Sequence, residues 1–121
     1  MQYMLLIYND PHGWDALSDN ERGAIYNAYG TFTAELQASG KMVAGDALQA
    51  IDTATSVRVR NGETVTTDGP FAETKEVLGG YYLIDVDTLD EAIEWAAKIP
   101  SARYGHIEVR PVVMREAEVA S

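Results

Sequence analysis

Hydrophobic residues along the chain alternate between the short apolar runs of strands and the three- and four-residue spacing of helices. Residues 2–8 are almost continuously apolar, which predicts a strand covered on both faces, and turn-forming residues end it at Asn9-Asp10-Pro11-His12-Gly13. Ser18 and Glu21 then have the spacing of a capping box. The apolar positions that follow predict one face of a long helix ending near Gly40: Ile25, Ala28, Tyr29, Phe32 and Leu36.

The middle of the chain predicts a strand and then a hairpin. Residues 41–50 indicate a strand that bends, or is closely approached, near Gly45. The alternating run Val57-Arg58-Val59-Arg60 leads to Asn61-Gly62, a residue pair that tight hairpin turns favour, and Val65 continues the pattern on the return strand.

The last third predicts a strand, a helix and a final strand. Residues 81–86 are mostly apolar, Thr88 and Glu91 have the spacing of a second capping box, and Pro100 ends the helix. The final strand should direct two sets of side chains to opposite faces: Ile107, Val109, Pro111 and Val113 on one, and His106, Glu108 and Arg110 on the other. We therefore expect one domain at 1–113 and a C-terminal tail at 114–121.

Without the hairpin, the order is strand, helix, strand, strand, helix, strand. That order predicts an α+β fold, a ferredoxin-like split βαβ sandwich with an inserted β-hairpin. Two helices cover only one face of the sheet, yet the strands at 2–8 and 81–86 are apolar on both faces. We therefore expect a homodimer in which a second copy covers the other face.

Composition narrows the location and the partners. The 121 residues include nine basic and nineteen acidic side chains, a formal net charge of −10, which disfavours nucleic acid and anionic membranes as partners. No cysteine is present, so disulfides, thiolate metal sites and cysteine nucleophiles are excluded. The amino terminus lacks a charged leader with a long apolar run, and we expect a cytoplasmic protein.

The run from Thr67 to Tyr82 is the most distinctive part of the sequence. It contains Asp68-Gly69-Pro70-Phe71, and it resembles the signature of the DGPF group within the YCII-related family. The resemblance extends to Met4-Leu5-Leu6-Ile7-Tyr8 and to Val57-Arg58-Val59-Arg60. It implies a ferredoxin-like fold that pairs sheet to sheet into a dimeric α+β barrel, with a cleft between helices and sheets.

The resemblance also bears on activity. The wider family is associated with an active-site histidine on the first helix and an aspartate in an Asp-Pro step after the second. The matching places here are Tyr29 and Ile99-Pro100, so neither acid-base group carries over. Proteins of the DGPF group often accompany extracytoplasmic-function sigma factors, which implies a link to transcriptional control.

The hairpin and the signature run supply the candidate ligand site, which comprises Asp68, Gly69, Pro70, Phe71, Arg58 and Tyr81. In this interpretation Asp68 projects into a cleft floored by Phe71, with Glu73, Lys75 and Glu76 at the rim; the alternative is that Asp68 caps a turn. Arg58 and Arg60 either recognise a carboxylate or phosphate ligand or pair with nearby acidic side chains.

Familiar catalytic motifs are absent from the sequence. His12 and His106 lack metal-site spacing, so no metal and no cofactor are expected, and Asp10-Pro11-His12 is either a general base with its carboxylate or a local turn. We expect a small cytoplasmic dimer that binds an unidentified small molecule, with catalytic residues unknown. The alternative is a cofactor-independent enzyme of the dimeric α+β barrel type, such as an isomerase, dehydrochlorinase or monooxygenase.

Overall fold

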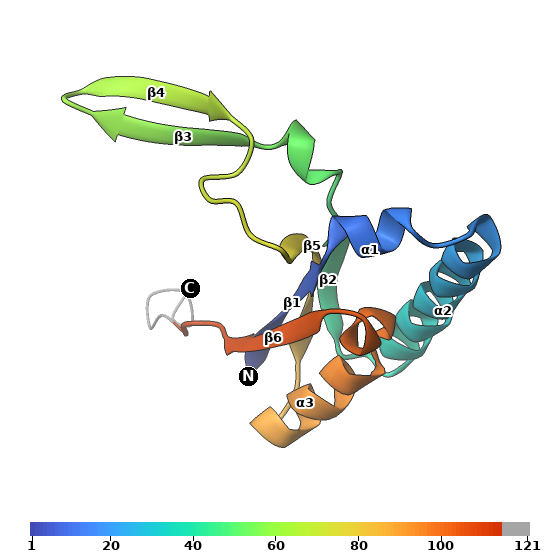
Figure 1. Cartoon of the computed structure of the whole chain (residues 1–121). Helices are drawn as coiled ribbons and strands as arrows, with labels where there is room; N and C mark the ends of the chain where they lie inside the picture. Colours follow the sequence, from blue (N-terminus) through green and yellow to red (C-terminus); the bar gives the residue numbers. More distant parts are fainter. Residues whose placement is uncertain (115–121) are drawn as a thin grey trace.

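The computed structural model describes residues 1–114, in which a four-stranded antiparallel sheet is the main element (Figure 1). Its strands are β1 (Gln2–Asn9), β2 (Met42–Ala47), β5 (Val77–Asp85) and β6 (His106–Pro111), in the order β2-β5-β1-β6. Two helices, α2 (Asp19–Ala38) and α3 (Leu89–Lys98), pack on one side of it. This arrangement is the expected ferredoxin-like fold, which is confirmed. The expected tail lies outside the described residues after Met114.

The core lies between this sheet and the two helices. Tyr3, Leu5 and Ile7 alternate along β1 and point into it, whereas the residues between them are only half-buried. Side chains from the other elements complete the core: Tyr82 and Ile84 from β5, Phe32 and Leu36 from α2, Ala92 and Ala96 from α3, with Val86 and Ile99. The prediction for the last strand is correct for Ile107 and Val109, which pack against this core, but Pro111 and Val113 are exposed, and β6 ends at Pro111.

The two capping boxes differ in outcome. Ser18 accepts from Glu21 N–H and the Glu21 carboxylate accepts from Ser18 N–H, so the first box is complete. At the second, Thr88 accepts from Glu91 N–H, but the Glu91 carboxylate accepts from Lys41 Nζ at 2.7 Å instead. This ion pair holds the start of β2 to the first turn of α3.

Glycines explain how closely β2 and β5 approach. A Cβ on Gly45 would lie 2.7 Å from a Tyr82 ring carbon, so the predicted close approach in the middle of β2 is confirmed. A Cβ on Gly80 would lie 2.9 Å from the backbone oxygen of Asp46. Gly79 and Gly80 are part of β5. This strand begins at Val77, four residues before the apolar run that predicted it.

The turn predicted after β1 includes a short helix, α1 (Pro11–Asp15). Asp10 is its N-cap and accepts from His12 N–H at 2.9 Å, and Pro11 occupies the first helical position. The same residues that favour a turn also favour a helix start, which is why the sequence pattern did not distinguish the two.

The predicted hairpin is present as β3 (Thr55–Arg60) and β4 (Glu63–Asp68), which we call the hairpin arm. Arg60 pairs with Glu63, so Asn61-Gly62 forms a two-residue turn with φ of 53° and 77°, as a type I′ turn requires. The arm extends away from the sheet, at the end where β5 begins (Figure 1). Two short 3-10 helices, η1 (Ile51–Thr53) and η2 (Pro100–Arg103), lie before the arm and after α3. Within residues 1–114, no helix has the length and hydrophobicity needed to cross a bilayer.

Hydroxyl groups join α2 to the rest of the core. Tyr29 forms a hydrogen bond with the hydroxyl of Ser101, which is buried, and Thr33 Oγ1 lies 2.7 Å from Tyr82 Oη. Burial raises the pKa of Tyr29, since a phenolate would lose its hydration there. Tyr29 is therefore a neutral hydrogen-bonding group at neutral pH.

We predict that Tyr29→Phe lowers the free energy of unfolding by about 1–3 kcal/mol, because the buried Ser101 hydroxyl loses its partner. The parent's raised Tyr29 pKa favours folding fully below the ordinary tyrosine value of 10.0, and this contribution is lost as the pH rises through the folded-state pKa. Urea unfolding at neutral and at alkaline pH measures both effects. Tyr26→Phe, at an exposed position of α2, is the control and should change neither; equal effects of the two substitutions would contradict the prediction.

We predict that Gly69→Val destabilises the protein by about 1–3 kcal/mol, because Gly69 has a φ of 92° that a branched residue does not tolerate. Gly69 N–H also donates to Ala54 O at 2.7 Å, closing the base of the arm. Glu73→Ala, in the exposed part of the same loop, should cost far less. Equal melting shifts for the two variants would show that the backbone at Gly69 is not constrained.

Candidate functional site

Within one chain, the structure does not bring the two charged signature residues together. Asp68 pairs with Thr55 across the arm, and Arg58 pairs with Val65. Because side chains alternate along a strand, this register directs Asp68 and Arg58 to opposite faces of the arm. Both residues are exposed. Nearness in sequence had suggested one cleft, but the pleat of the hairpin separates them.

The remaining signature residues form an exposed connection. Phe71 has 83% of its surface exposed and does not floor a cleft within the chain. The turn after Asp68 is held by other groups: Ser56 Oγ donates to Gly69 O at 2.8 Å, and Gly69 N–H donates to Ala54 O. The turn therefore does not depend on an Asp68 cap.

Tyr81, the last member of the predicted site, lies on the face of the sheet away from the helices. Its hydroxyl donates to Asp46 Oδ2 at 2.9 Å. The carboxylate favours the protonated phenol, and this hydrogen bond raises the pKa of Tyr81. Neither Asp68 nor Arg58 comes from this part of the fold.

We call this uncovered side the open sheet face. The register places its side chains in three rows across β5, β1 and β6. The central strand supplies mainly apolar groups, and polar groups stand on both flanks. The rows are Leu83, Met4 and Arg110; Tyr81, Leu6 and Glu108; and Leu78, Tyr8 and His106.

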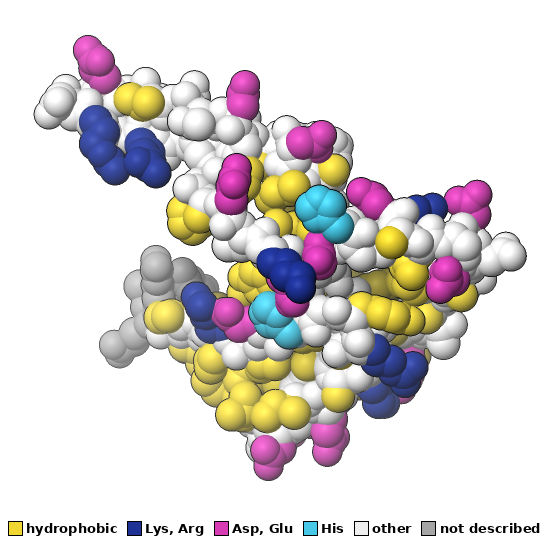
Figure 2. Space-filling model, in the orientation of Figure 1, with side chains coloured by type: hydrophobic (Ala, Val, Ile, Leu, Met, Phe, Trp, Pro, Cys, Tyr) yellow, Lys and Arg dark blue, Asp and Glu magenta, His cyan; other side chains and the backbone are white. Residues whose placement is uncertain are grey.

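A histidine and a glutamate form a close pair at one end of this face. His106 Nδ1 lies 2.6 Å from Glu76 Oε1, and the Tyr8 ring stacks on the imidazole at 4.9 Å between centroids and 6° between planes. Figure 2 shows the histidines beside acidic and basic side chains at the junction of the arm with the body. A carboxylate on Nδ1 fixes the ring and leaves Nε2 to accept or donate a proton.

This pair was missed by the sequence analysis, which placed Glu76 at a rim and treated His106 alone. The two residues are separated by 30 positions and by the whole of α3, so no local spacing joins them. The signature loop is what brings them together, because Glu76 is its last residue before β5.

A second polar pair on the open sheet face is incompletely satisfied. Arg110 Nη2 lies 2.6 Å from Glu108 Oε2, at an angle that does not give a hydrogen bond. Glu108 Oε2 is buried and has no other hydrogen-bond partner within residues 1–114. Because this oxygen is buried within the chain, the Arg110 guanidinium is the positive charge beside it.

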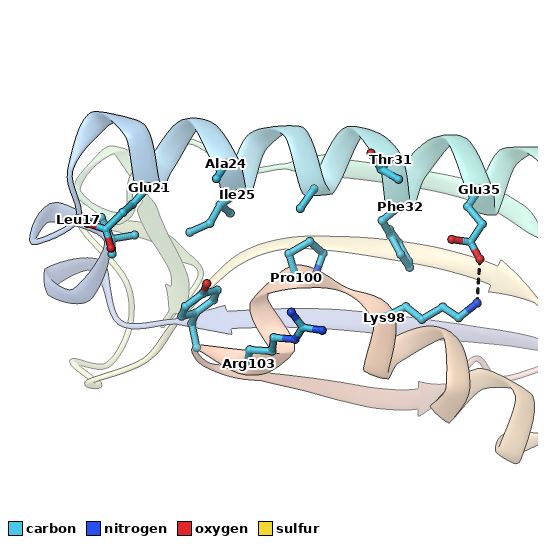
Figure 3. Close-up of a pocket in the computed structure, with 12 residues that line it drawn as sticks. Leu17, Glu21, Ala24, Ile25, Thr31, Phe32, Glu35, Lys98, Pro100 and Arg103 are labelled. Atoms are coloured by element: carbon cyan, nitrogen blue, oxygen red, sulfur yellow. Dashed lines mark hydrogen bonds and ion pairs between the residues drawn. The ribbon is translucent and has the colours of Figure 1, made fainter.

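An open groove of about 660 Å³ lies on the opposite side, between α2 and the segment around η2 (Figure 3). Lys98 Nζ and Glu35 Oε1, 2.8 Å apart, form an ion pair across one end. Its walls are mainly apolar: Leu17, Ala24, Ile25, Ala28, Phe32 and Pro100. Polar side chains also line it: Glu21, Thr31, Glu35, Lys98, Arg103 and Tyr104. The Glu21 carboxylate is bonded to Ser18 N–H, and Glu35 is paired with Lys98. The groove lining contains no histidine, whereas the open sheet face carries a histidine paired with a carboxylate, so we take the open sheet face as the better candidate for chemistry. Among the described residues, no three histidine or acidic side chains are placed to hold a metal ion.

Comparisons with known proteins agree with this fold. The YCII-related domain family matches residues 1–116. An uncharacterized protein from Rhizobium meliloti (strain 1021) is 37% identical over 116 residues, which cover 94% of each chain. A solved structure of 5-chloro-2-hydroxyhydroquinone dehydrochlorinase from Burkholderia phenoliruptrix AC1100, in complex with 2,5-dihydroxybenzoquinone, has a TM-score of 0.58 and 13% identity. The alignment covers 97% of this chain and 98% of that one, and at such identity it shows the fold alone.

The family that the signature run indicated is thus the family found over nearly the whole chain. The fold, the 37% identical relative and the match over residues 1–116 lead to one conclusion. This chain belongs to the YCII-related domain family.

Proposed function

We propose that the protein is a cytoplasmic homodimer that binds a small polar or aromatic molecule at the open sheet face. One observation carries the proposal: the His106–Glu76, Tyr81–Asp46 and Arg110–Glu108 pairs surround an apolar stripe on a single uncovered side of the sheet. Small-molecule sites commonly combine an apolar surface with a few placed polar groups.

The dimer follows from the apolar stripe. Met4, Leu6 and Leu83 share the open sheet face, and neither α2 nor α3 covers them. A second copy of the same face would bury this surface symmetrically, and contiguous apolar surface is otherwise disfavoured in a monomer. Polar residues at the flanks would then border the space between the two sheets.

The ligand class follows from the flanks. The Tyr8 and His106 rings are parallel and stacked, and the outer face of such a stack suits a planar molecule. Tyr81 and His106 each provide a group that donates or accepts a hydrogen bond. Of the six site residues expected from the sequence, Tyr81 keeps a direct role in this proposal. Gly69 and Pro70 shape the loop that carries Glu76, and Asp68, Phe71 and Arg58 would have to act on a second copy.

A regulatory role is the physiological part of the proposal. It is supported by the resemblance to the DGPF group and its association with extracytoplasmic-function sigma factors. The net charge of −10 disfavours direct contact with DNA, so regulation would proceed through a bound small molecule.

A second candidate function is cofactor-independent proton transfer, which the His106–Glu76 pair favours. Glu76 holds Nδ1, and Nε2 would take a proton from a bound substrate. The dehydrochlorinase of similar fold offers a precedent for chemistry on this scaffold, as an analogy of fold alone.

We predict that the protein in solution has twice the 13.2 kDa mass of one chain. Leu6→Glu should produce a monomer, because it places a charge in the middle of the apolar stripe. Ile93→Glu, on the half-exposed outer side of α3, is the matched control and should remain dimeric. Light scattering after size exclusion measures both masses. A parent protein that stays monomeric at high micromolar concentration would refute the dimer.

We predict that a library of planar hydroxylated acids and quinones, including 2,5-dihydroxybenzoquinone, contains a ligand whose binding shifts the amide resonances of Tyr8, Tyr81 and His106. Tyr8→Ala or His106→Ala should weaken its binding roughly tenfold, through loss of the stacking wall or of a hydrogen bond. Tyr26→Phe should leave binding unchanged, because Tyr26 lies on α2.

The parent protein is to be tested for turnover of that ligand alongside His106→Gln and Glu76→Gln. Turnover by the parent that both variants lose, while they still bind the ligand, would favour the enzyme over the binding protein. Resonance shifts confined to the groove of Figure 3 would move the binding site to the helical side of the sheet.

A further inference from the structure

The hairpin arm has no packing surface of its own. Every residue of β4 is exposed, and in β3 only Ser56 is not. Val57 and Val59 are each 61% exposed, and Val65 is 45% exposed. Two-stranded hairpins without a third strand or a covering helix are marginally stable in water. We therefore expect the arm to pack against another protein surface.

The two faces of the arm differ in charge. The register places Arg58, Arg60 and Val65 on one face, and Val57 and Val59 on the other. Neither guanidinium forms an ion pair within residues 1–114; Arg60 Nη1 donates only to the backbone oxygen of Val59. In Figure 2 the basic side chains of the arm lie on the side that faces the hollow between the arm and the body.

A second copy of this chain carries negative charges that could pair with Arg58 and Arg60. Arg58 and Arg60 offset Glu63 and Asp68 within the arm, so the remainder of the chain carries the full net charge of −10. On the open sheet face, Asp46 is exposed and accepts from Tyr81 through Oδ2, which leaves Oδ1 for a second donor. Arginines suit such carboxylates, since a guanidinium donates to two oxygens at once.

We propose that each arm docks on a second copy of the chain, with its Arg58, Arg60 and Val65 face toward the carboxylates beside the partner's open sheet face. This inference rests on the homodimer proposed above, and it identifies the hairpin arm as an element that holds the two copies together. In a two-fold dimer the exchange is reciprocal. Each ligand site is then composite: Tyr81 and His106 come from one copy, and the partner's arm borders the site from the other.

The arm can be removed without disturbing the body, because Gly69 N–H already donates to Ala54 O at its base. The first variant therefore joins Ala54 to Gly69 through a short Gly-Ser link in place of residues 55–68. Two further variants keep the arm and change the net charge equally, but on opposite faces. Arg58→Thr with Arg60→Thr removes two positive charges from the proposed docking face, and Thr64→Glu with Thr66→Glu adds two negative charges to the other.

Sedimentation velocity over a dilution series measures the dissociation constant of the dimer for the parent and each variant. We expect Arg58→Thr with Arg60→Thr to raise it roughly tenfold, the effect of losing two ion pairs, and excision of the arm to raise it further. Thr64→Glu with Thr66→Glu should leave it unchanged. Amide hydrogen exchange should show arm protection that falls as the parent is diluted.

The outcomes separate this inference from the dimer itself. If the parent dimerises and the arginine and excision variants dimerise equally well, the arm does not clasp a second copy, and the dimer stands. Equal weakening by both charge variants would overturn the proposal as well, because net charge alone would explain it. A parent that is monomeric at every concentration refutes the dimer and the clasp together.

Discussion

The central strand β1 is apolar on both sides, and the helices cover only one of them. Tyr3, Leu5 and Ile7 are buried against α2 and α3, while Met4 and Leu6 alternate with them on the open sheet face. Because α2 and α3 lie on the same side of the sheet, neither covers the second face, and the proposed dimer would complete it with a second copy. The fold, the proposed dimer and the place of the candidate site all depend on this constraint.

The signature loop acquires a physical role from the same arrangement. It connects an arm that projects from the sheet to the start of β5, and Gly69 with its positive φ makes the change of direction possible. Its last residue before β5, Glu76, reaches His106 on the edge strand β6. The loop thus links the polar end of the open sheet face to the arm, which explains why unusual turn chemistry and charge occur together in one short run.

Local signals in the sequence were sufficient for most of the fold. The capping box at Ser18, the Asn61-Gly62 turn and the alternation around Val57 depend on neighbouring residues only, and each is present. Contacts between distant segments were not predictable in this way. The Glu91 carboxylate bonds to Lys41 and not to the Thr88 N–H of its own helix cap, and His106 meets Glu76 across α3.

The predicted ligand site shows the same limit. Asp68 and Arg58 are close in sequence, but the register of the hairpin directs them to opposite faces. Tyr81 lies on the sheet, and its partner Asp46 comes from β2, which no motif had joined to it. The residue types in the sequence indicated which side chains could bind a ligand. Which of those side chains share a surface is decided by the pairing of the strands.

The hydroxyl pair between α2 and η2 also constrains the chemistry. Tyr29 stands where the resemblance to the wider family would place a histidine, and it bonds to Ser101 in the core. Its pKa is raised by burial, so the phenol stays protonated at neutral pH, and a serine hydroxyl is no base by itself. This pair stabilises the packing of α2 but offers no proton acceptor. Any acid-base reaction of this chain would therefore need titratable groups elsewhere, and in the proposed proton transfer His106 with Glu76 would supply them on the open sheet face.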